Sequence, residues 1–192
     1  MIDDVWSALI VMILSYALGC ITGAYYVVKY LAKEDIRYIG SGNAGATNAG
    51  RALGKSGFLL TIAVDAGKTW GALYAAGLFF EGDAVFILSA VCVLLGHLFP
   101  IQIGFRGGKG VVVYLASALF MEPLTIAIMA AVMGIMYAVI RKYTLSGLIS
   151  ISSIPIAAWM IGDSFIIAAG LSVMLIIVLL SHTNFIMPKH RR

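Results

Sequence analysis

Residues 164–181 read SFIIAAGLSVMLIIVLLS, an unbroken run without a charged side chain. A helix needs roughly 20 mostly apolar residues to cross the roughly 30 Å hydrocarbon core of a bilayer, so this run predicts a transmembrane helix. Other apolar runs fill the rest of the chain, at 6–28, 57–80, 84–105, 111–121, 124–140 and 143–161. Among these, 57–80 contains two charged residues, Asp65 and Lys68. The sequence therefore predicts an all-α integral membrane protein of about seven transmembrane helices.

The composition agrees with this class. The chain has 192 residues, of which 61% are hydrophobic and only 11% charged, and its mean hydropathy is +1.01. A water-soluble domain needs far more polar surface than this composition supplies. We expect a single membrane-embedded domain over residues 1–192, because seven short spans leave no room for a second one.

The distribution of charge predicts the orientation. If the N-terminus lies outside, the inner connections are 29–56, 106–110, 141–142 and the tail from His182. All 13 Lys and Arg residues then lie at or near the inner side, as the positive-inside rule requires. We expect a multi-pass protein of the cell membrane with its N-terminus outside, its C-terminus in the cytoplasm and its active site facing the cytoplasm.

The fourth run, 111–121, is too short to span alone, since it covers roughly 16 Å at about 1.5 Å per residue. One alternative is that its helix starts further back, within 107–110. The other is that this glycine-rich loop lies below the lipid headgroups, where protein or a water-filled cavity must surround it. Both alternatives put Lys109 at a helix N-terminus.

Two glycine pairs have the spacing that lets transmembrane helices approach closely. Gly19 precedes Gly23, and Gly67 precedes Gly71, in each case by four residues. Small residues at this spacing predict close helix packing at both places.

The first candidate site is the connection between the first two runs, where residues 40–51 read GSGNAGATNAGR. Glycines allow backbone N–H groups to converge on a ligand, neutral side chains add donors, and an arginine supplies a planar fork suited to phosphate. A flexible connector made of turn residues is the alternative. The candidate binding residues are Ser41, Gly42, Asn43, Gly45, Thr47, Asn48 and Arg51.

The second candidate site combines residues 96–100, GHLFP, with residues 106–110, RGGKG. The unpaired N–H groups and positive dipole end of a helix favour phosphate, and Lys109 adds a mobile charge beside them. Gly107, Gly108 and Gly110 would form the loop, with His97 close by. A tight basic turn between two spans is the alternative.

Further polar groups lie at the inner ends of other runs. Asp65 and Lys68 are three residues apart on one helix face, which favours a buried ion pair, although Lys68 remains a candidate for substrate binding. Ser146, His182 and Asn184 could line the same inner vestibule. For His182, an interfacial anchor and a catalytic base fit the spacing equally well.

On these residues the chain resembles the acyl-phosphate-dependent glycerol-3-phosphate acyltransferases of bacteria, polytopic enzymes that make lysophosphatidic acid. The resemblance runs nearly end to end and implies a seven-helix fold, an acyl phosphate donor and glycerol 3-phosphate as acceptor. It also implies that the glycine loop with Lys109 holds the donor phosphate, and that Arg51 with the Ser and Asn groups of 40–51 holds the acceptor. Several positions depart from the family pattern. Ala44 stands where many members have proline, Thr69 replaces a glycine, and Val112 and Val113 replace a small and a hydroxyl residue. His182 lies one residue closer to Asn184 than in the usual His-x-x-Asn.

An acyl phosphate is already activated, so the expected mechanism is direct attack by the acceptor hydroxyl, without a covalent enzyme intermediate. Lys109 and Arg51 would neutralise the phosphates, and His97, His182 or a substrate phosphate oxygen would take the proton. We expect no metal or other cofactor, no nucleic-acid partner, and function as a monomer. The alternatives are a paralogue with another phosphorylated acceptor, an anion transporter and a non-catalytic membrane adaptor.

Overall fold

The computed structural model describes residues 5–162 and 164–183, and that part of the chain forms helices and turns with no strand. Two short 3-10 helices, η1 (Ile36–Tyr38) and η2 (Ile101–Ile103), lie in connections. The α-helices are α1 (Val5–Gly19), α2 (Gly23–Leu31), α3 (Ala46–Phe79), α4 (Asp83–Leu98), α5 (Val111–Met121), α6 (Pro123–Ile140), α7 (Tyr143–Ile151), α8 (Ser153–Ile161) and α9 (Phe165–His182).

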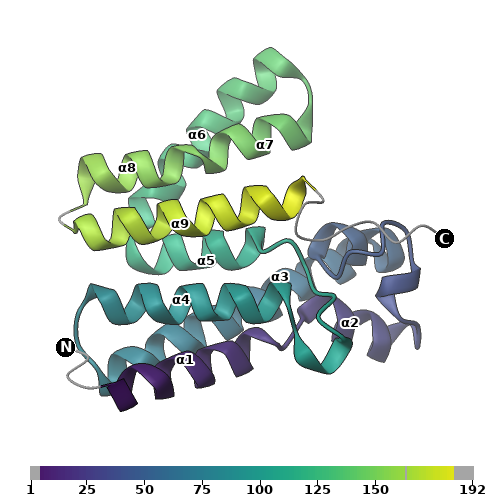
Figure 1. Cartoon of the computed structure of the whole chain (residues 1–192). Coiled ribbons are helices and arrows are strands. Elements are labelled where there is room, and N and C mark those ends of the chain that lie inside the picture. The colour runs from purple at the N-terminus through teal and green to yellow at the C-terminus, as the bar shows by residue number, and fades with distance from the viewer. Residues whose placement is uncertain (1–4, 163, 184–192) are drawn as a thin grey trace.

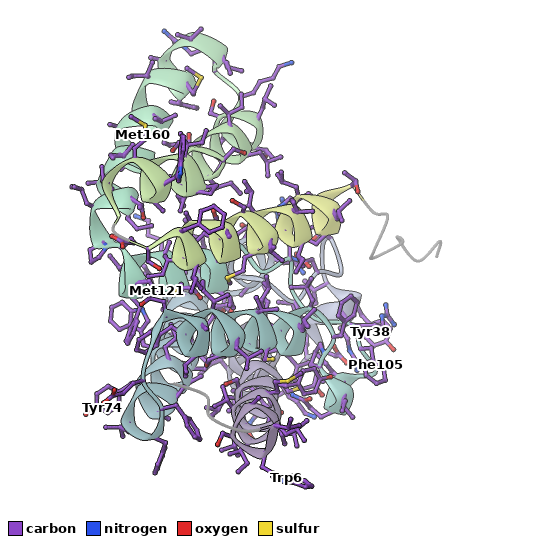
Figure 2. The ribbon with its side chains drawn as sticks, turned by 60° about the vertical axis from the view of Figure 1, so that its left-hand side comes forward. Trp6, Tyr38, Tyr74, Phe105, Met121 and Met160 are labelled. Carbon is purple, nitrogen blue, oxygen red and sulfur yellow. The ribbon has the colours of Figure 1, made fainter. Side chains whose placement is uncertain are left out.

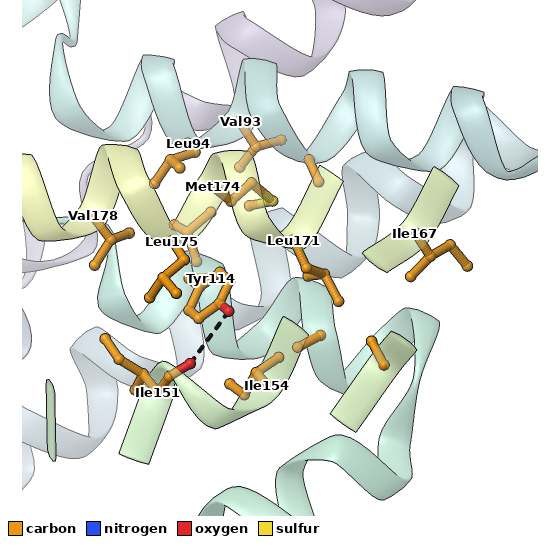
Figure 3. Packing of buried hydrophobic residues seen from close by; sticks show 14 of the residues in the cluster. Val93, Leu94, Tyr114, Ile151, Ile154, Ile167, Leu171, Met174, Leu175 and Val178 are labelled. Carbon is orange, nitrogen blue, oxygen red and sulfur yellow. Dashed lines mark hydrogen bonds between the residues drawn. The ribbon is translucent and has the colours of Figure 1, made fainter. Parts of the chain in front are cut away.

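The helices form one bundle with a smaller layer at its side. Helices α1, α3, α4, α5 and α9 run along a common direction, and α6, α7 and α8 pack beyond α5 and α9 (Figure 1). Buried side chains of α4, α5, α8 and α9 meet between the layers (Figure 3). There, the Tyr114 hydroxyl donates to the Ile151 carbonyl oxygen at 3.4 Å, which ties α5 to the end of α7.

The outer surface of the bundle is apolar. Large side chains such as Trp6, Tyr74 and Met160 point away from the protein and are mostly exposed (Figure 2). Five helical segments of the described chain are long and apolar enough to cross a membrane: Val5–Leu31, Asp83–Ile103, Pro123–Ile140, Tyr143–Ile161 and Phe165–His182. The all-helical membrane class is confirmed, because hydrocarbon, and not water, suits such a surface.

Two of the predicted runs are not single helices. The run at 6–28 breaks between the end of α1 at Gly19 and the start of α2 at Gly23, and the run at 143–161 divides at Ser152. Hydropathy alone does not mark either break, because no charged residue interrupts the run at 20–22 or at Ser152. Each run nevertheless lies in one segment long and apolar enough to cross a membrane, Val5–Leu31 and Tyr143–Ile161, with the break inside it.

A kink inside α3 separates its first turns from the rest of the helix. Gly54 has φ 68° and ψ −155°, a backbone conformation that residues with a side chain rarely adopt. The residues before it belong to the first candidate loop. The residues after it include the predicted run 57–80, which is helical but is not among the five segments named above.

Helix α5 begins at Val111, and residues 107–110 before it are not helical. Gly110 has φ 81°, which favours glycine, and Gly107, Gly108 and Gly110 are buried inside the protein. Of the two alternatives for this region, the structure has the one in which the glycine-rich loop is enclosed by protein.

The two glycine pairs behave differently. A Cβ at Gly19 would overlap the backbone of Val93 on α4, and one at Gly23 would lie 3.0 Å from the Thr61 carbonyl oxygen. Close packing is therefore confirmed for the first pair. For Gly67 and Gly71 the prediction was wrong, since a Cβ there meets no atom within 4 Å and both residues face outward.

Candidate functional site

The connections that the charge pattern assigns to the inner side lie at one end of the bundle. Figure 1 shows α2, the loop between α4 and α5, the turn between α6 and α7, and the C-terminal end of α9 together at that end. Both glycine-rich stretches belong to this group, so residues far apart in sequence can contribute to one site.

The first stretch, which we call the first loop (residues 40–51), is shaped by Asn48. Its side chain is buried; its Oδ1 accepts from the Ser41 N–H at 3.1 Å, and its Nδ2 donates to the carbonyl oxygens of Ile39 at 2.9 Å and Ile36 at 3.4 Å. The amide oxygen and the amide nitrogen of Asn48 are thus both bonded to backbone groups of residues 36–41, and Asn48 holds this part of the chain in place.

Other polar groups of the first loop remain open to a ligand. Ser41, Thr47 and Arg51 are exposed, and Asn43 is half-buried. Helix α3 begins directly after Gly45, and no side chain caps its first N–H groups. A helix N-terminus beside an arginine is a suitable place for an anion.

The second stretch, which we call the second loop (residues 106–110), folds back onto the end of α4. The Gly107 N–H donates to the Leu98 carbonyl oxygen and the Gly108 N–H to the His97 carbonyl oxygen, both at 3.1 Å. A Cβ at Gly107 would overlap the carbonyl oxygen of His97, and a Cβ at Gly108 would overlap the His97 ring. The loop therefore requires glycine, because the backbone itself packs against the helix end.

One hydrogen bond joins the two loops. The Ala44 N–H donates to the Gly107 carbonyl oxygen at 3.3 Å. The structure thus brings together the two motifs that the sequence presents separately, and it does so through backbone atoms.

Helix α9 completes this end of the bundle. The Ser181 hydroxyl donates to the Lys109 carbonyl oxygen at 2.9 Å and also lies 2.7 Å from the Val178 carbonyl oxygen. His182 is half-buried, and its Nδ1 lies 2.9 Å from the same Val178 oxygen. Ser181 was missed by the sequence analysis, although it stands three residues before Asn184, the spacing at which the family pattern has its histidine.

Beneath the second loop lies a cluster of three buried polar side chains, Asp65, Lys68 and His97, each exposed by 7% or less. The Lys68 Nζ lies 2.8 Å from Asp65 Oδ1 and 2.9 Å from His97 Nδ1. The buried ion pair predicted from the spacing of Asp65 and Lys68 is confirmed.

The same ion pair fills the break between α1 and α2. Lys68 Nζ donates to the carbonyl oxygens of Gly19 at 3.0 Å and Ile21 at 2.6 Å, and Asp65 Oδ1 accepts from the Gly23 N–H at 3.1 Å. A broken helix leaves carbonyls at one end and N–H groups at the other. The cation and the carboxylate satisfy these two ends, which is why the break is tolerated at membrane depth.

A second ion pair holds the surface turn before the first loop. Asp35 accepts from the Arg37 guanidinium, with 2.5 Å between the nearest oxygen and nitrogen, and Arg37 Nη1 donates to the Ile103 carbonyl oxygen at 2.8 Å. The hydrogen bonds from Arg37 hold the pKa of Asp35 below its ordinary value. Arg37 was not predicted, because its contact with η2 depends on the tertiary fold.

Two predicted site residues are not connected to the loops by the structure. Ser146 is buried on α7, which packs on α6 and α8, and its hydroxyl has no hydrogen-bond partner in the described part of the chain. Asn184 lies outside the described residues. Within residues 5–162 and 164–183, no group of three or more His, Cys, Asp or Glu side chains is arranged to hold a metal ion.

Comparison with known proteins agrees with these features. A family model described as glycerol-3-phosphate acyltransferase matches residues 9–189. A protein described as glycerol-3-phosphate acyltransferase 1 from Desulfitobacterium hafniense is 43% identical over 170 residues, covering 88% of this chain and 83% of that protein. One of the same description from Bacillus cereus is 37% identical over 175 residues, covering 90% and 94%.

The fold also matches a solved structure along nearly its whole length. The crystal structure of PlsY (YgiH), an integral membrane glycerol 3-phosphate acyltransferase, in its glycerol 3-phosphate form, gives a TM-score of 0.82 at 28% identity. The match covers 97% of this chain and 95% of that one. From its sequence motifs, its helical fold and these matches, the chain belongs to the glycerol-3-phosphate acyltransferase family.

Proposed function

We propose that this protein transfers a fatty acyl group from an acyl phosphate to the 1-hydroxyl of sn-glycerol 3-phosphate, giving lysophosphatidic acid and phosphate, the first step of phospholipid synthesis. The observation that carries the proposal is the Ala44–Gly107 hydrogen bond, which holds two anion-binding loops side by side. Two adjacent sites for phosphate suit a reaction in which both substrates are phosphorylated. The solved relative described in a glycerol 3-phosphate form supports this choice of acceptor.

Each loop receives one substrate in this proposal. Lys109 and the Gly110 N–H hold the donor phosphate. Gly107 and Gly108, predicted to bind it as well, shape the loop instead, because their N–H groups already donate to carbonyl oxygens at the end of α4. Arg51 and the open groups of the first loop, with Ser41 and Thr47 among them, hold the acceptor phosphate. Asn48 and Lys68 contribute by holding the backbone, as their saturated contacts indicate.

The acyl transfer needs no cofactor to account for the bonds that form and break. The acceptor hydroxyl oxygen attacks the acyl carbonyl carbon and forms the new ester bond, the bond between that carbon and the phosphate oxygen breaks, and the phosphate leaves with its electron pair. Phosphate is a good leaving group, so the protein's task is to position both substrates and stabilise charge.

His182 has the geometry of a proton acceptor for the attacking hydroxyl. A carbonyl oxygen can only accept, so the 2.9 Å contact of Nδ1 with Val178 places the hydrogen on Nδ1. In the neutral ring, Nε2 then keeps its lone pair. A phosphate oxygen of the substrate is the alternative acceptor.

The proposed topology has seven membrane segments, with the N-terminus outside and the C-terminus in the cytoplasm. Counting α1 with α2 and α7 with α8 as single segments leaves seven, with the short α5 among them. The common position of the positively charged connections at one end supports a cytoplasmic active site. We propose further that the whole chain is one domain and acts as a monomer.

The test is phosphate release from palmitoyl phosphate by the purified protein, with and without glycerol 3-phosphate, with the lipid product identified by mass. Release that depends on the acceptor, with lysophosphatidic acid as product, is the expected result. Release with other phosphorylated acceptors only would point to a paralogue. Uptake of phosphate into proteoliposomes without any acyl transfer would overturn the proposal in favour of a transporter.

A further inference from the structure

We propose that His97 is a positioning residue, which Lys68 holds in one tautomer so that its ring supports the second loop from below, and that it is not the proton acceptor. The inference rests on the proposed function, because it assigns a role within that same site. It concerns the buried cluster of Asp65, Lys68 and His97, which lies between the α1–α2 break and the second loop.

The contacts of Lys68 decide the tautomer. An ammonium group has hydrogens to donate and no lone pair to accept. Lys68 Nζ has four acceptor atoms within 3.0 Å and three hydrogens, so one hydrogen is shared between Asp65 Oδ1 and His97 Nδ1. A hydrogen on His97 Nδ1 would point at the cation 2.9 Å away, which is repulsive, so the cation favours Nδ1 as an acceptor. Asp65 Oδ1, which would favour a hydrogen on Nδ1, is further away at 3.5 Å. The neutral ring therefore carries its hydrogen on Nε2.

The other edge of the ring faces the backbone of the second loop. The nearest atom to a Cβ built on Gly108 is His97 Nε2, close enough to overlap it. His97 is 2% exposed, and its own carbonyl oxygen accepts from the Gly108 N–H at 3.1 Å. Lys68 lies against one ring nitrogen and the backbone of Gly108 against the other.

These contacts form a continuous chain from the helix break to the substrate loops. Lys68 links the carbonyls of Gly19 and Ile21 to His97, the His97 ring supports Gly108, and the neighbouring Gly107 accepts from Ala44. Loss of the support should displace the second loop, and with it Lys109. The expected kinetic effect is therefore weaker binding of the donor, while the chemistry of proton transfer is unchanged.

The two histidines are thus fixed in opposite tautomers. His182 carries its hydrogen on Nδ1, which contacts a carbonyl oxygen, whereas His97 accepts at Nδ1 from a cation. This difference gives the inference a direct spectroscopic signature that does not depend on turnover.

The first experiment is 15N NMR of the full chain, labelled at histidine and reconstituted in lipid, with His97→Asn used to assign the His97 signals. We expect an unprotonated Nδ1 and a protonated Nε2 for His97. Lys68→Met should abolish this preference, and Lys55→Met, which changes an exposed lysine on the same helix, should leave it intact. A protonated Nδ1 in the unaltered protein would overturn the inference, and this readout stands even if Lys68→Met does not fold.

The second experiment compares His97→Asn with His97→Gln in the acyl-transfer assay. The asparagine amide can offer Lys68 an acceptor near the position of Nδ1, so we expect this variant to keep kcat within about 10-fold, with an increased donor KM and an unchanged pH profile. Loss of a general base costs about 10²–10⁴-fold in rate. A kcat loss of that size in both variants, together with loss of a titration from the pH profile, would overturn the positioning role.

The two proposals fail in different ways. If the unaltered protein transfers no acyl group from palmitoyl phosphate, the proposed function fails, yet the tautomer of His97 is still decided by NMR. If transfer is normal and the tautomer is reversed, only the positioning role fails.

Discussion

The Ser181 hydroxyl donates to the carbonyl oxygen of Lys109 at 2.9 Å, so the last helix holds the backbone of the second loop at the residue that carries its charge. Hydrogen bonds of this kind contribute about 0.5–1.5 kcal/mol each. Ser181→Ala removes the bond and leaves the Lys109 ammonium in place. We expect a donor KM raised by roughly 2- to 10-fold with little change in kcat. A steady-state titration of acyl phosphate measures this, and Ser172→Ala, which removes a hydroxyl bonded only within α9, is the control.

Lys109→Met tests the charge itself. A methionine keeps the length of the side chain and removes the cation that we assign to the donor phosphate. Removing one group that stabilises developing charge costs about 10²–10³-fold in kcat, and we expect a loss in that range. Lys142→Met, at an exposed position between α6 and α7, should retain activity. Transfer near the unaltered rate in folded Lys109→Met protein would contradict the assignment.

Arg51→Gln should act on the other substrate. Arg51 is exposed in the first turns of α3, beside the open groups of the first loop. Hydrogen bonds to a charged group contribute about 1.5–3 kcal/mol, so we expect the KM for glycerol 3-phosphate to rise by about 10- to 100-fold and the donor KM to change little. An equal rise in the KM for glycerol 3-phosphate and in the donor KM would contradict the assignment of Arg51 to the acceptor. Lys55→Gln, which changes another exposed cation of α3 just beyond the kink at Gly54, is the control.

Gly108→Ala should damage the site through packing alone. The added Cβ would overlap the ring of His97, and overpacking of this kind costs about 1–3 kcal/mol. We expect a lower unfolding temperature in lipid and weaker donor binding. Gly134→Ala adds the same methyl group on α6, where it meets nothing within 4 Å. That variant should be as stable as the unaltered protein or slightly more, since alanine favours helix. Equal stability of the two variants would argue against the tight fit at Gly108.

Asp35 predicts a pH dependence of stability outside the membrane segments. Its pKa in the folded protein is lowered, first by hydrogen bonds from Arg37, below the ordinary value of 3.8. The stabilisation is therefore fully present above about pH 4 and is lost as the pH falls through the folded pKa. Asp35→Asn should lower thermal stability at pH 7 and remove this part of the acid dependence. Melting curves between pH 3 and pH 7 test it, and parallel curves for both proteins would contradict the prediction.

The sequence by itself determined the class of the protein and the position of its two loops. Charged side chains are too costly in hydrocarbon to be scattered, so the apolar runs indicated the membrane helices. The two glycine-rich stretches stood out because each combines glycines with a cation, Arg51 or Lys109, which suits phosphate. The buried pair of Asp65 and Lys68 followed from their spacing on one helix face.

Only the tertiary structure decided how these parts work together. The break after Gly19 is stable because Lys68 and Asp65 reach it from α3, and the loops meet because the Ala44 N–H finds the Gly107 carbonyl oxygen. The enclosure of His97 beneath Gly108 and the outward position of Gly67 likewise depend on which helices are neighbours. The physical reason is that local sequence sets which segments are helical and apolar, whereas buried polar groups must find partners wherever the fold brings them.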